Sequence, residues 1–407
     1  MSLQTFWREV TQLNGAPKAR SSHSVAVCGK KAYVFGGEFE PRVPIDNLVY
    51  AYDLENRSWS IIEGKGEAPA PRVGVTLVAV DNLLYVFAGR DKEHKELNEL
   101  FSFNVDSGEW KLLSSGAKSP PERSYHAFAA DERNQKLYTF GGCGKDGRLN
   151  DLWVYDIKSG EWEAQSSSSS CIPRGGPGLV VVNGAVWVIF GFNGCELTDI
   201  HRYDLATKSW EEIEATGEKP TGRSVFGTSV FGKYILIYGG EVDPSDQGHL
   251  GAGAFSCEIY LLDTELREWS KPEVTIEGGK HPGARGWYAF SSYENSMLVY
   301  GGNSDSNDRL EDMFLLTLEV DKNIGQNEQT LDILGYCIFF VLDNIVPKLK
   351  KIAPRLVLVQ GRKCKGALAL ALFKACTIKV MQGSKARLTR TEANVKIARH
   401  EERLTVL

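Results

Sequence analysis

One loop of the sequence, residues 241–249, gathers the side-chain types that hold a transition metal ion. Glu241, Asp243 and Asp246 supply carboxylates and His249 supplies an imidazole, all within nine residues. Two oxygens and one nitrogen match the ligand set of a non-haem Fe(II) site and leave coordination positions open for a substrate. The same acidic loop would also be typical of a solvated turn, and the residues alone leave both interpretations open.

A second set of candidates is cationic and aromatic. Arg90 lies outside the series of repeating arginines described below, so its guanidinium is a candidate for binding an anion through its fork-shaped donors. Trp287 lies outside the repeating tryptophans, and it could pack against an apolar substrate or plug the core. Tyr125 is expected at the same height in another repeat. His23 and His126 occupy equivalent places in two repeats and are interpreted as repeat features rather than catalysts.

An internal repeat supplies the elements that must position these residues. Tryptophan recurs at Trp7, Trp59, Trp110, Trp162, Trp210 and Trp269, and arginine at Arg20, Arg72, Arg123, Arg174, Arg223 and Arg285. A glycine pair closes an apolar run at Gly36-Gly37, Gly141-Gly142, Gly239-Gly240 and Gly301-Gly302, and it is degraded to Ala88-Gly89 and Gly191-Phe192. These series stay in register, which indicates a repeat of about 50 residues.

One period is predicted to contain four strands. In the third unit these are Ser124–Ala130, Lys136–Phe140, Leu152–Tyr155 and Glu161–Gln165. A four-stranded unit with a glycine pair and a spaced tryptophan resembles the Kelch repeat of β-propellers. The predicted fold class is therefore all-β, a six-bladed Kelch propeller.

The two ends of the repeat region complement each other. The last unit has a third strand near Met313–Leu318 but no following tryptophan, whereas Thr5–Val10 carries Trp7 before any first strand. We expect this N-terminal strand to complete the last blade and close the propeller, residues 1–320. Residues 321–407 lack the blade pattern and hold 16 Lys and Arg against 7 Asp and Glu. They are predicted to be a basic, non-propeller tail, weakly ordered or of uncertain origin.

The mouth of the predicted propeller should carry the chemistry. The first strand of each blade begins after the repeating arginine and the second ends at the glycine pair, so both points lie on one face. That face would gather the six arginines and the residues after the pairs, which are Glu38, Arg90, Cys143, Asn193, Glu241 and Asn303. A ring of guanidinium groups would favour an anion. The alternative is that each repeating arginine is a structural strut to a neighbouring blade.

Composition excludes several classes of protein. The 407 residues carry a net charge of −5, and no apolar run reaches the roughly 18–20 residues of a membrane helix. Because the main body is acidic, nucleic-acid binding is not expected. Met1–Val10 lacks a signal-peptide pattern, and the eight cysteines form no CxxC pair. These features predict a cytoplasmic protein with reduced thiols, with the nucleus as the other compartment.

Several motifs together resemble the plant specifier proteins, the family of nitrile-specifier, epithiospecifier and thiocyanate-forming Kelch proteins. They are the repeat register, Arg90 after the second pair, the 241–249 loop with its Gly251-Ala252-Gly253 follower, and Arg285-Gly286-Trp287. The resemblance implies an Fe(II) cofactor held by a Glu-x3-Asp-x3-His loop. Glu241 and His249 match its first and third ligands. Ser245 replaces the middle aspartate, so Asp246, or alternatively Asp243, is the expected substitute.

The resemblance also implies a reaction. Specifier proteins take the thiohydroximate-O-sulfate aglycone that myrosinase releases from a glucosinolate and divert it to nitriles or related products. Arg90 would hold the sulfate and Trp287 would lie beside the substrate as the candidate catalytic residues, with Tyr125 and Glu38 as further substrate contacts. The competing interpretation is a non-catalytic Kelch scaffold whose propeller face binds a partner protein.

Overall fold

The structure is a computed structural model, and it describes residues 3–247, 251 and 253–320. Within this part of the chain, the regular elements are β-strands and one short 3-10 helix, η1 (Gly116–Lys118). The all-β prediction is therefore confirmed. The predicted tail, residues 321–407, lies outside the described residues, so the domain division near residue 320 stays a prediction.

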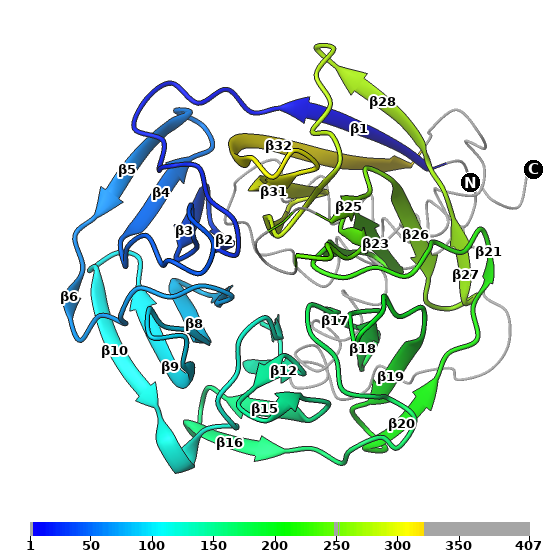
Figure 1. The fold of residues 1–407 in the computed structure, drawn as a ribbon, viewed down its shortest axis with the longest axis horizontal. Helices are drawn as coiled ribbons and strands as arrows, with labels where there is room; N and C mark the ends of the chain where they lie inside the picture. The colour runs from blue at the N-terminus through cyan, green and yellow to red at the C-terminus, as the bar shows by residue number, and fades with distance from the viewer. Residues whose placement is uncertain (1–2, 248–250, 252, 321–407) are drawn as a thin grey trace, which may run out of the picture. The chain divides into compact units, whose positions relative to one another are not determined.

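Six sheets form the blades of a propeller around a common centre (Figure 1). Blade 1 is β2 (Ser24–Cys28), β3 (Lys31–Phe35), β4 (Val49–Asp53) and β5 (Ser58–Ile62). Blade 2 is β7 (Thr76–Val80), β8 (Leu83–Arg90), β9 (Glu96–Asn104) and β10 (Glu109–Ser114), with β6 (Lys65–Gly66) parallel to β10. Blade 3 is β11 (Ala127–Asp131), β12 (Lys136–Phe140), β15 (Leu152–Asp156) and β16 (Glu161–Ala164).

The remaining blades follow the same order. Blade 4 is β17 (Gly178–Val182), β18 (Ala185–Ile189), β19 (Ile200–Asp204) and β20 (Ser209–Glu212). Blade 5 is β22 (Gly227–Phe231), β23 (Tyr234–Tyr238), β26 (Ile259–Asp263) and β27 (Glu268–Ser270), with β21 (Thr216–Gly217) beside β27. Blade 6 is β30 (Ala289–Tyr293), β31 (Ser296–Ser304), β32 (Arg309–Val320) and β1 (Leu3–Glu9), with β29 (Arg285–Gly286) on β31 and β28 (Glu273–Glu277) outside β1.

The N-terminal strand closes the ring as predicted. β1 pairs antiparallel with β32, and Trp7 lies opposite Leu316 in that register. Trp7 is fully buried. Closure removes the open edge that β32 would otherwise present to solvent.

The first strand of each blade begins later than predicted. In blade 3 the sheet starts at Ala127 rather than Ser124. Ser124 pairs instead with Cys143, and Tyr125 has a φ of 51°, which takes the backbone out of the extended conformation. The residues that the sequence assigns to the strand but that precede it in the structure are those that reach the propeller axis.

The repeating tryptophans join neighbouring blades. Trp110 of blade 2 packs on Phe103 of its own blade and on Phe35 of blade 1, with ring centroids 4.7 and 5.5 Å apart. Such aromatic contacts contribute both buried apolar area and ring–ring attraction. The repeat spacing seen in the sequence therefore corresponds to one tryptophan per interface between blades.

The buried imidazole of His23 should make the fold less stable at acidic pH. Burial, and secondarily the charge of Arg20, lowers the pKa of His23 to about 3. Between that value and the unfolded pKa near 6.5 the unfolded chain binds more protons, so the free energy of unfolding falls as pH drops. Each pH unit in this range changes the free energy of unfolding by about 1.4 kcal/mol. We therefore expect the free energy of unfolding of His23→Phe to fall by about 3 kcal/mol less between pH 7 and pH 4 than that of the unsubstituted chain. Phe is chosen because Phe226 occupies the equivalent place in blade 5.

Urea unfolding at pH 7 and pH 4, followed by tryptophan fluorescence, measures this difference. His94→Phe is the control, since His94 is exposed. Parallel pH profiles for His23→Phe and the unsubstituted chain would contradict the prediction.

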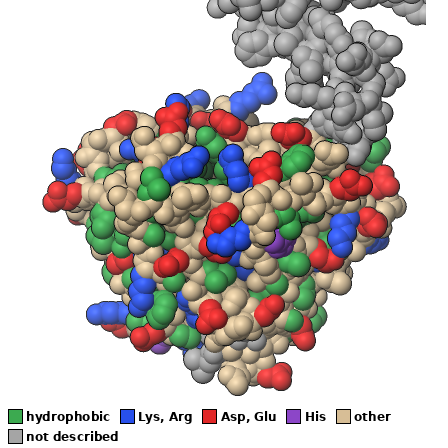
Figure 2. Space-filling view, turned by 90° about the horizontal axis from the view of Figure 1, so that it is seen from above, with side chains coloured by type: hydrophobic (Ala, Val, Ile, Leu, Met, Phe, Trp, Pro, Cys, Tyr) green, Lys and Arg blue, Asp and Glu red, His purple; other side chains and the backbone are tan. Residues whose placement is uncertain are grey.

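The surface seen in Figure 2 mixes acidic and basic side chains without a large field of one sign on that face. No helix in the described residues is long and apolar enough to cross a bilayer.

Candidate functional site at the propeller mouth

Six residues, one from each blade, form a closed circle of backbone hydrogen bonds around the propeller axis. Each backbone N–H donates to the carbonyl oxygen of the preceding member, with N···O distances of 2.8–3.2 Å, and Ser22 completes the circle by donating to Trp287. The members, here called the axial belt, are Ser22, Gly74, Tyr125, Gly176, Val225 and Trp287. All six have φ between 48° and 59°, a region where non-glycine residues are strained.

Two aromatic side chains cover the centre of the axial belt. Tyr125 of blade 3 and Trp287 of blade 6 come from opposite blades and pack edge to face, with ring centroids 5.3 Å apart. Gly74 makes room for this packing, because a Cβ there would lie 2.8 Å from the Tyr125 ring. Two predicted substrate contacts, Tyr125 and Trp287, are thus brought together at the axis.

The repeating arginines do not form an exposed cationic ring. All six are 0–1% exposed. Each donates from Nη1 to the carbonyl oxygen at the bend after the second strand of its own blade, at 2.8–3.0 Å. Each also has a carboxylate oxygen within 4 Å. The strut interpretation is correct, except that the hydrogen bonds hold a bend within the blade rather than a neighbouring blade.

The residue after each bend lies beside the axial belt. These residues are Glu38, Arg90, Cys143, Phe192, Glu241 and Asn303, each paired with the residue that follows the arginine. In blade 4 the sequence assignment of Asn193 is one residue too late. The bend there uses Phe190 and Gly191, with φ of 53° and 111°, as Ala88 and Gly89 do in blade 2.

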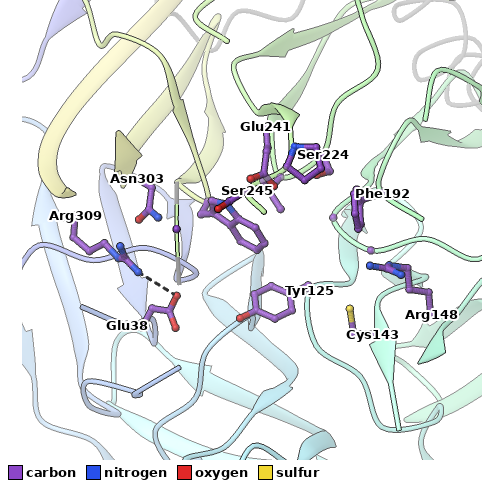
Figure 3. A pocket seen from close by; sticks show the side chains of 16 residues that line it. Glu38, Tyr125, Cys143, Arg148, Phe192, Ser224, Glu241, Ser245, Asn303 and Arg309 are labelled. Atoms are coloured by element: carbon purple, nitrogen blue, oxygen red, sulfur yellow. Dashed lines mark ion pairs between the residues drawn. The ribbon is translucent and has the colours of Figure 1, made fainter. Parts of the chain in front are cut away.

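A cavity of about 160 Å³ is lined by belt residues and by the residues after the bends. Tyr125 and Trp287 line both this cavity and the channel between the innermost strands, so they lie between the two and form the floor of the cavity. Figure 3 shows Glu38, Asn303 and Arg309 on one side and Cys143, Arg148 and Phe192 on the other. Glu241, Ser224 and Ser245 line the wall between them.

Of the predicted metal ligands that the structure describes, Glu241 is the one that lines this cavity. It begins β24 (Glu241–Asp243), which pairs with β25 (Ala254–Phe255). Burial raises the pKa of Glu241 to about 7, while a backbone hydrogen bond from Ser245 lowers it and the charge of Asp243 raises it further. Asp243 and Asp246 are exposed and are not among the lining residues.

The described residues supply part of the ligand set that the sequence predicts for Fe(II). The Glu241 carboxylate and the Ser245 hydroxyl are oxygen donors on one wall, and two glycines leave them space. A Cβ at Gly253 would come within 2.2 Å of Glu241 Oε1, and one at Gly251 within 2.2 Å of Ser245 Oγ. His249 lies outside the described residues. Among those described, no group of three His, Cys, Asp or Glu residues could hold a metal ion.

Arg90, the predicted sulfate ligand, is engaged elsewhere. Its guanidinium forms an ion pair with Glu96, with Nε donating to Oε1 at 2.8 Å, and it lies 5.8 Å from the Tyr125 ring centroid. Arg90 is not among the residues that line the cavity. The structure therefore places it behind Tyr125 rather than at the cavity surface.

Arg148 is a cationic lining residue that the sequence analysis missed. It ends the short hairpin of β13 (Cys143–Gly144) and β14 (Gly147–Arg148). Its guanidinium lies 4.6 Å from the Phe192 ring centroid, and its Nε is buried without a hydrogen-bond partner. No carboxylate of the described residues lies within 4 Å of it. The available signal was its position six residues after Gly142, because Arg309 follows Gly302 by seven.

Glu196 is an acidic group whose charge interacts with that of Arg148. Burial raises the pKa of Glu196 to about 8, against the hydrogen bond from Ser224, and the charge of Glu241 raises it further. Glu196 is therefore mostly protonated at neutral pH. Arg148 thus lines the cavity outside any ion pair of the described residues.

Comparison with known proteins agrees with this architecture. The family model described as the KLHDC2/KLHL20/DRC7 Kelch-repeats domain matches residues 7–240. The chain is 37% identical over 348 residues to an N-(sulfonatooxy)prop-2-enimidothioate sulfolyase of Thlaspi arvense, covering 78% of this chain and 98% of that protein. The chain belongs to the Kelch-repeat specifier family.

Other Kelch proteins are more distant from this specifier-family chain. The host cell factor homolog hcf-1 of Caenorhabditis elegans is 29% identical over 58% of the chain, which spans 33% of that protein's length. The solved structure of YjhT matches with a TM-score of 0.61 at 18% identity, covering 76% of this chain and 98% of that one, and it shows the fold alone. The six-bladed Kelch prediction and the family resemblance are confirmed.

Proposed function

We propose that this chain is a specifier protein that diverts glucosinolate aglycones to nitriles or related products with Fe(II). The name of the Thlaspi arvense relative describes a substrate with a sulfonatooxy group on nitrogen and a thioate sulfur. The observation that carries the proposal is the guanidinium of Arg148, which lies outside any ion pair of the described residues, in a cavity that also holds the buried Glu241 carboxylate. Myrosinase, which releases the aglycone, would supply the substrate.

The cavity residues have separate tasks in this proposal. Arg148 binds the sulfate group and stabilises the negative charge that grows on it as the N–O bond breaks. The Tyr125–Trp287 floor packs against the carbon skeleton and excludes water from below. For nitrile formation the N–O electron pair leaves with sulfate, the carbon–nitrogen bond becomes triple, and the C–S bond breaks to release neutral sulfur.

Glu241, Ser245 and His249 are the residues that would hold Fe(II). Fe(II), when bound, supplies a Lewis acid for the substrate sulfur. Glu241 provides the anionic oxygen on the cavity wall. Ser245 provides a neutral oxygen where the family motif has a carboxylate, so we expect weaker metal binding than a Glu-x3-Asp-x3-His loop would give.

Product analysis tests the function. Purified chain is mixed with myrosinase, an aliphatic glucosinolate and increasing Fe(II), and nitrile and isothiocyanate are quantified. We expect nitrile above the protein-free control. We also expect about tenfold less Fe(II) for half-maximal yield in Ser245→Asp, because a carboxylate is a better ligand than a hydroxyl for this ion.

Ser245→Asn is the matched control, since it has the size of Asp without the charge, and it should not lower the Fe(II) requirement. Isothiocyanate alone at every protein and iron concentration, in the unsubstituted chain and in Ser245→Asp, would refute the specifier proposal. The similarity to host cell factor proteins favours one alternative, a non-catalytic Kelch scaffold for a protein partner. That alternative predicts this negative result.

A further inference from the structure

The sheet of blade 6 ends in an extra strand whose outer edge is open. β28 pairs in parallel with β1, and the strand order of this sheet ends at β28. Of the strands that the structure describes, none pairs with its other edge, which lies at the rim of the propeller (Figure 1). The corresponding strands β6 and β21 have two residues each and end at Gly66 and Gly217, whereas β28 has five residues and no glycine. A long open edge of this kind can pair with a strand of another chain.

The backbone groups at this edge are those of Val274 and Ile276. Thr5 Oγ1, on β1, donates to the Glu273 carbonyl oxygen at 2.9 Å, so that carbonyl points toward β1. Successive residues of a strand direct their N–H and C=O groups to opposite edges, so Val274 and Ile276 direct theirs away from β1. The edge therefore offers two donors and two acceptors to an added strand.

The side chains of β28 are exposed on both of its faces. Val274 and Ile276 are 43% and 42% exposed, and they share one face because they are two residues apart. An added strand with apolar side chains opposite these two residues would cover them. Five paired residues bury far less than the roughly 1,000 Å² of a stable interface, so the contact should be transient.

The other face of β28 carries a carboxylate at each end, Glu273 and Glu277. Arg8 lies opposite Glu277 in the register of β1, but among the described residues neither glutamate takes part in an ion pair. Opposite charges across two strands stabilise a sheet, whereas like charges directly opposite each other destabilise it. The complementary strand therefore has a basic residue at each of these two places.

The same charges disfavour a second copy of this chain as the occupant. In an antiparallel pairing of two β28 strands centred on Thr275, Glu273 of each copy would lie opposite Glu277 of the other. In a parallel pairing in register, each glutamate would lie opposite its own equivalent. Both arrangements place like charges together, so the edge favours a partner of different sequence.

We propose that β28 binds an extended segment of a partner protein with the pattern basic–apolar–any–apolar–basic. The segment adds one antiparallel strand to the blade 6 sheet. Its two apolar residues exchange backbone hydrogen bonds with Val274 and Ile276, and its two basic residues lie opposite Glu273 and Glu277. This inference concerns the rim of the propeller and does not rest on the function proposed for the mouth cavity.

Calorimetric titration of the full chain at low ionic strength with the blocked peptide Ser-Lys-Val-Thr-Val-Lys-Ser tests this contact. We expect a Kd of about 100 µM, in the range of a small and transient interface. The control is the same peptide with N-methyl groups on its two valines, which keeps the charge and the side chains but removes the two donors that face β28. It should bind at least about tenfold more weakly, because two hydrogen bonds are lost.

Variants of β28 separate the contributions. The double variant Glu273→Lys, Glu277→Lys should lose the basic peptide and bind the peptide that has Glu in place of both Lys residues. Ile276→Pro removes an outward N–H, which an edge strand tolerates, and should abolish binding at an unchanged melting temperature. Ile276→Ala is its matched control, since it shortens the side chain but keeps the N–H, and it should weaken binding less.

Two results would overturn the proposal. One is equal affinity for the two peptides, or no heat of binding at about 1 mM peptide. The other is a dimer in analytical ultracentrifugation that Ile276→Pro dissociates, because it would assign this edge to a second copy of the chain.

Discussion

Replacement of Arg148 by Gln should lower kcat/KM for nitrile formation about 100-fold. The guanidinium lines the cavity and has no carboxylate within 4 Å in the described residues, so its charge is available to an incoming sulfate. Removing one positioned donor from a partly desolvated site typically costs a factor of 10² to 10³. Product analysis by gas chromatography over a range of glucosinolate concentrations, with excess myrosinase, gives the ratio.

Lys145→Gln is the matched control, because Lys145 is exposed at the tip of the same hairpin and carries the same charge. It should change kcat/KM less than twofold. Arg90→Gln should have a smaller effect on the rate than Arg148→Gln, since Glu96 already compensates Arg90. A larger loss from Arg90→Gln would show that the sulfate is held there, as the family resemblance implies.

Replacement of Arg123 by Leu should destabilise the propeller by about 3–5 kcal/mol, the usual cost of breaking a buried ion pair from one side. Arg123 is fully buried and binds Asp151 through two N–H···O bonds of 2.9 and 2.7 Å. It also donates to the carbonyl oxygen of Gly141 at 3.0 Å. Leu would fill part of the volume, but it would leave the Gly141 carbonyl oxygen without the Arg123 donor and Asp151 with the hydrogen bond from Trp153 Nε1 in place of an ion pair.

Urea unfolding followed by circular dichroism measures this loss. Arg133→Ala, an exposed arginine in the same blade, should stay within about 0.5 kcal/mol of the unsubstituted chain. The double variant Arg123→Leu, Asp151→Leu should recover part of the stability, because it removes the unpaired carboxylate together with its partner. A loss below 1 kcal/mol for Arg123→Leu would contradict the strut role of the repeating arginines.

The fold was predictable because three residue series repeat for separate physical reasons. Tryptophan fills the interface between blades, arginine holds the bend, and glycine permits the positive φ that the bend needs. The blade 4 register was wrong because Phe190 adopts that conformation without being glycine. Arg174 donates a hydrogen bond to the Phe190 carbonyl oxygen at 2.9 Å, and this bond helps to hold the bend in place.

The site was predictable only in part. Tyr125, Trp287, Glu38 and Glu241 line one cavity, and this position follows from their fixed places relative to the repeat, while their roles stay predictions. Arg148 and Arg309 were missed because each lies on the strand that follows the loop after the bend, and these loops differ in length between blades. The pairing of Arg90 with Glu96 was also not visible, since a separation of six positions in the sequence does not reveal which side chains meet.

The axial belt makes the mouth cavity a dead end. Its backbone circle and the covering rings of Tyr125 and Trp287 separate the cavity from the channel lined by the innermost strands. A molecule that enters from the mouth has to leave through the same opening. In the proposed reaction, the released sulfate and the next substrate therefore use the same opening. The sulfate has to dissociate from Arg148 before the next substrate can bind. Free sulfate should compete directly with substrate for entry.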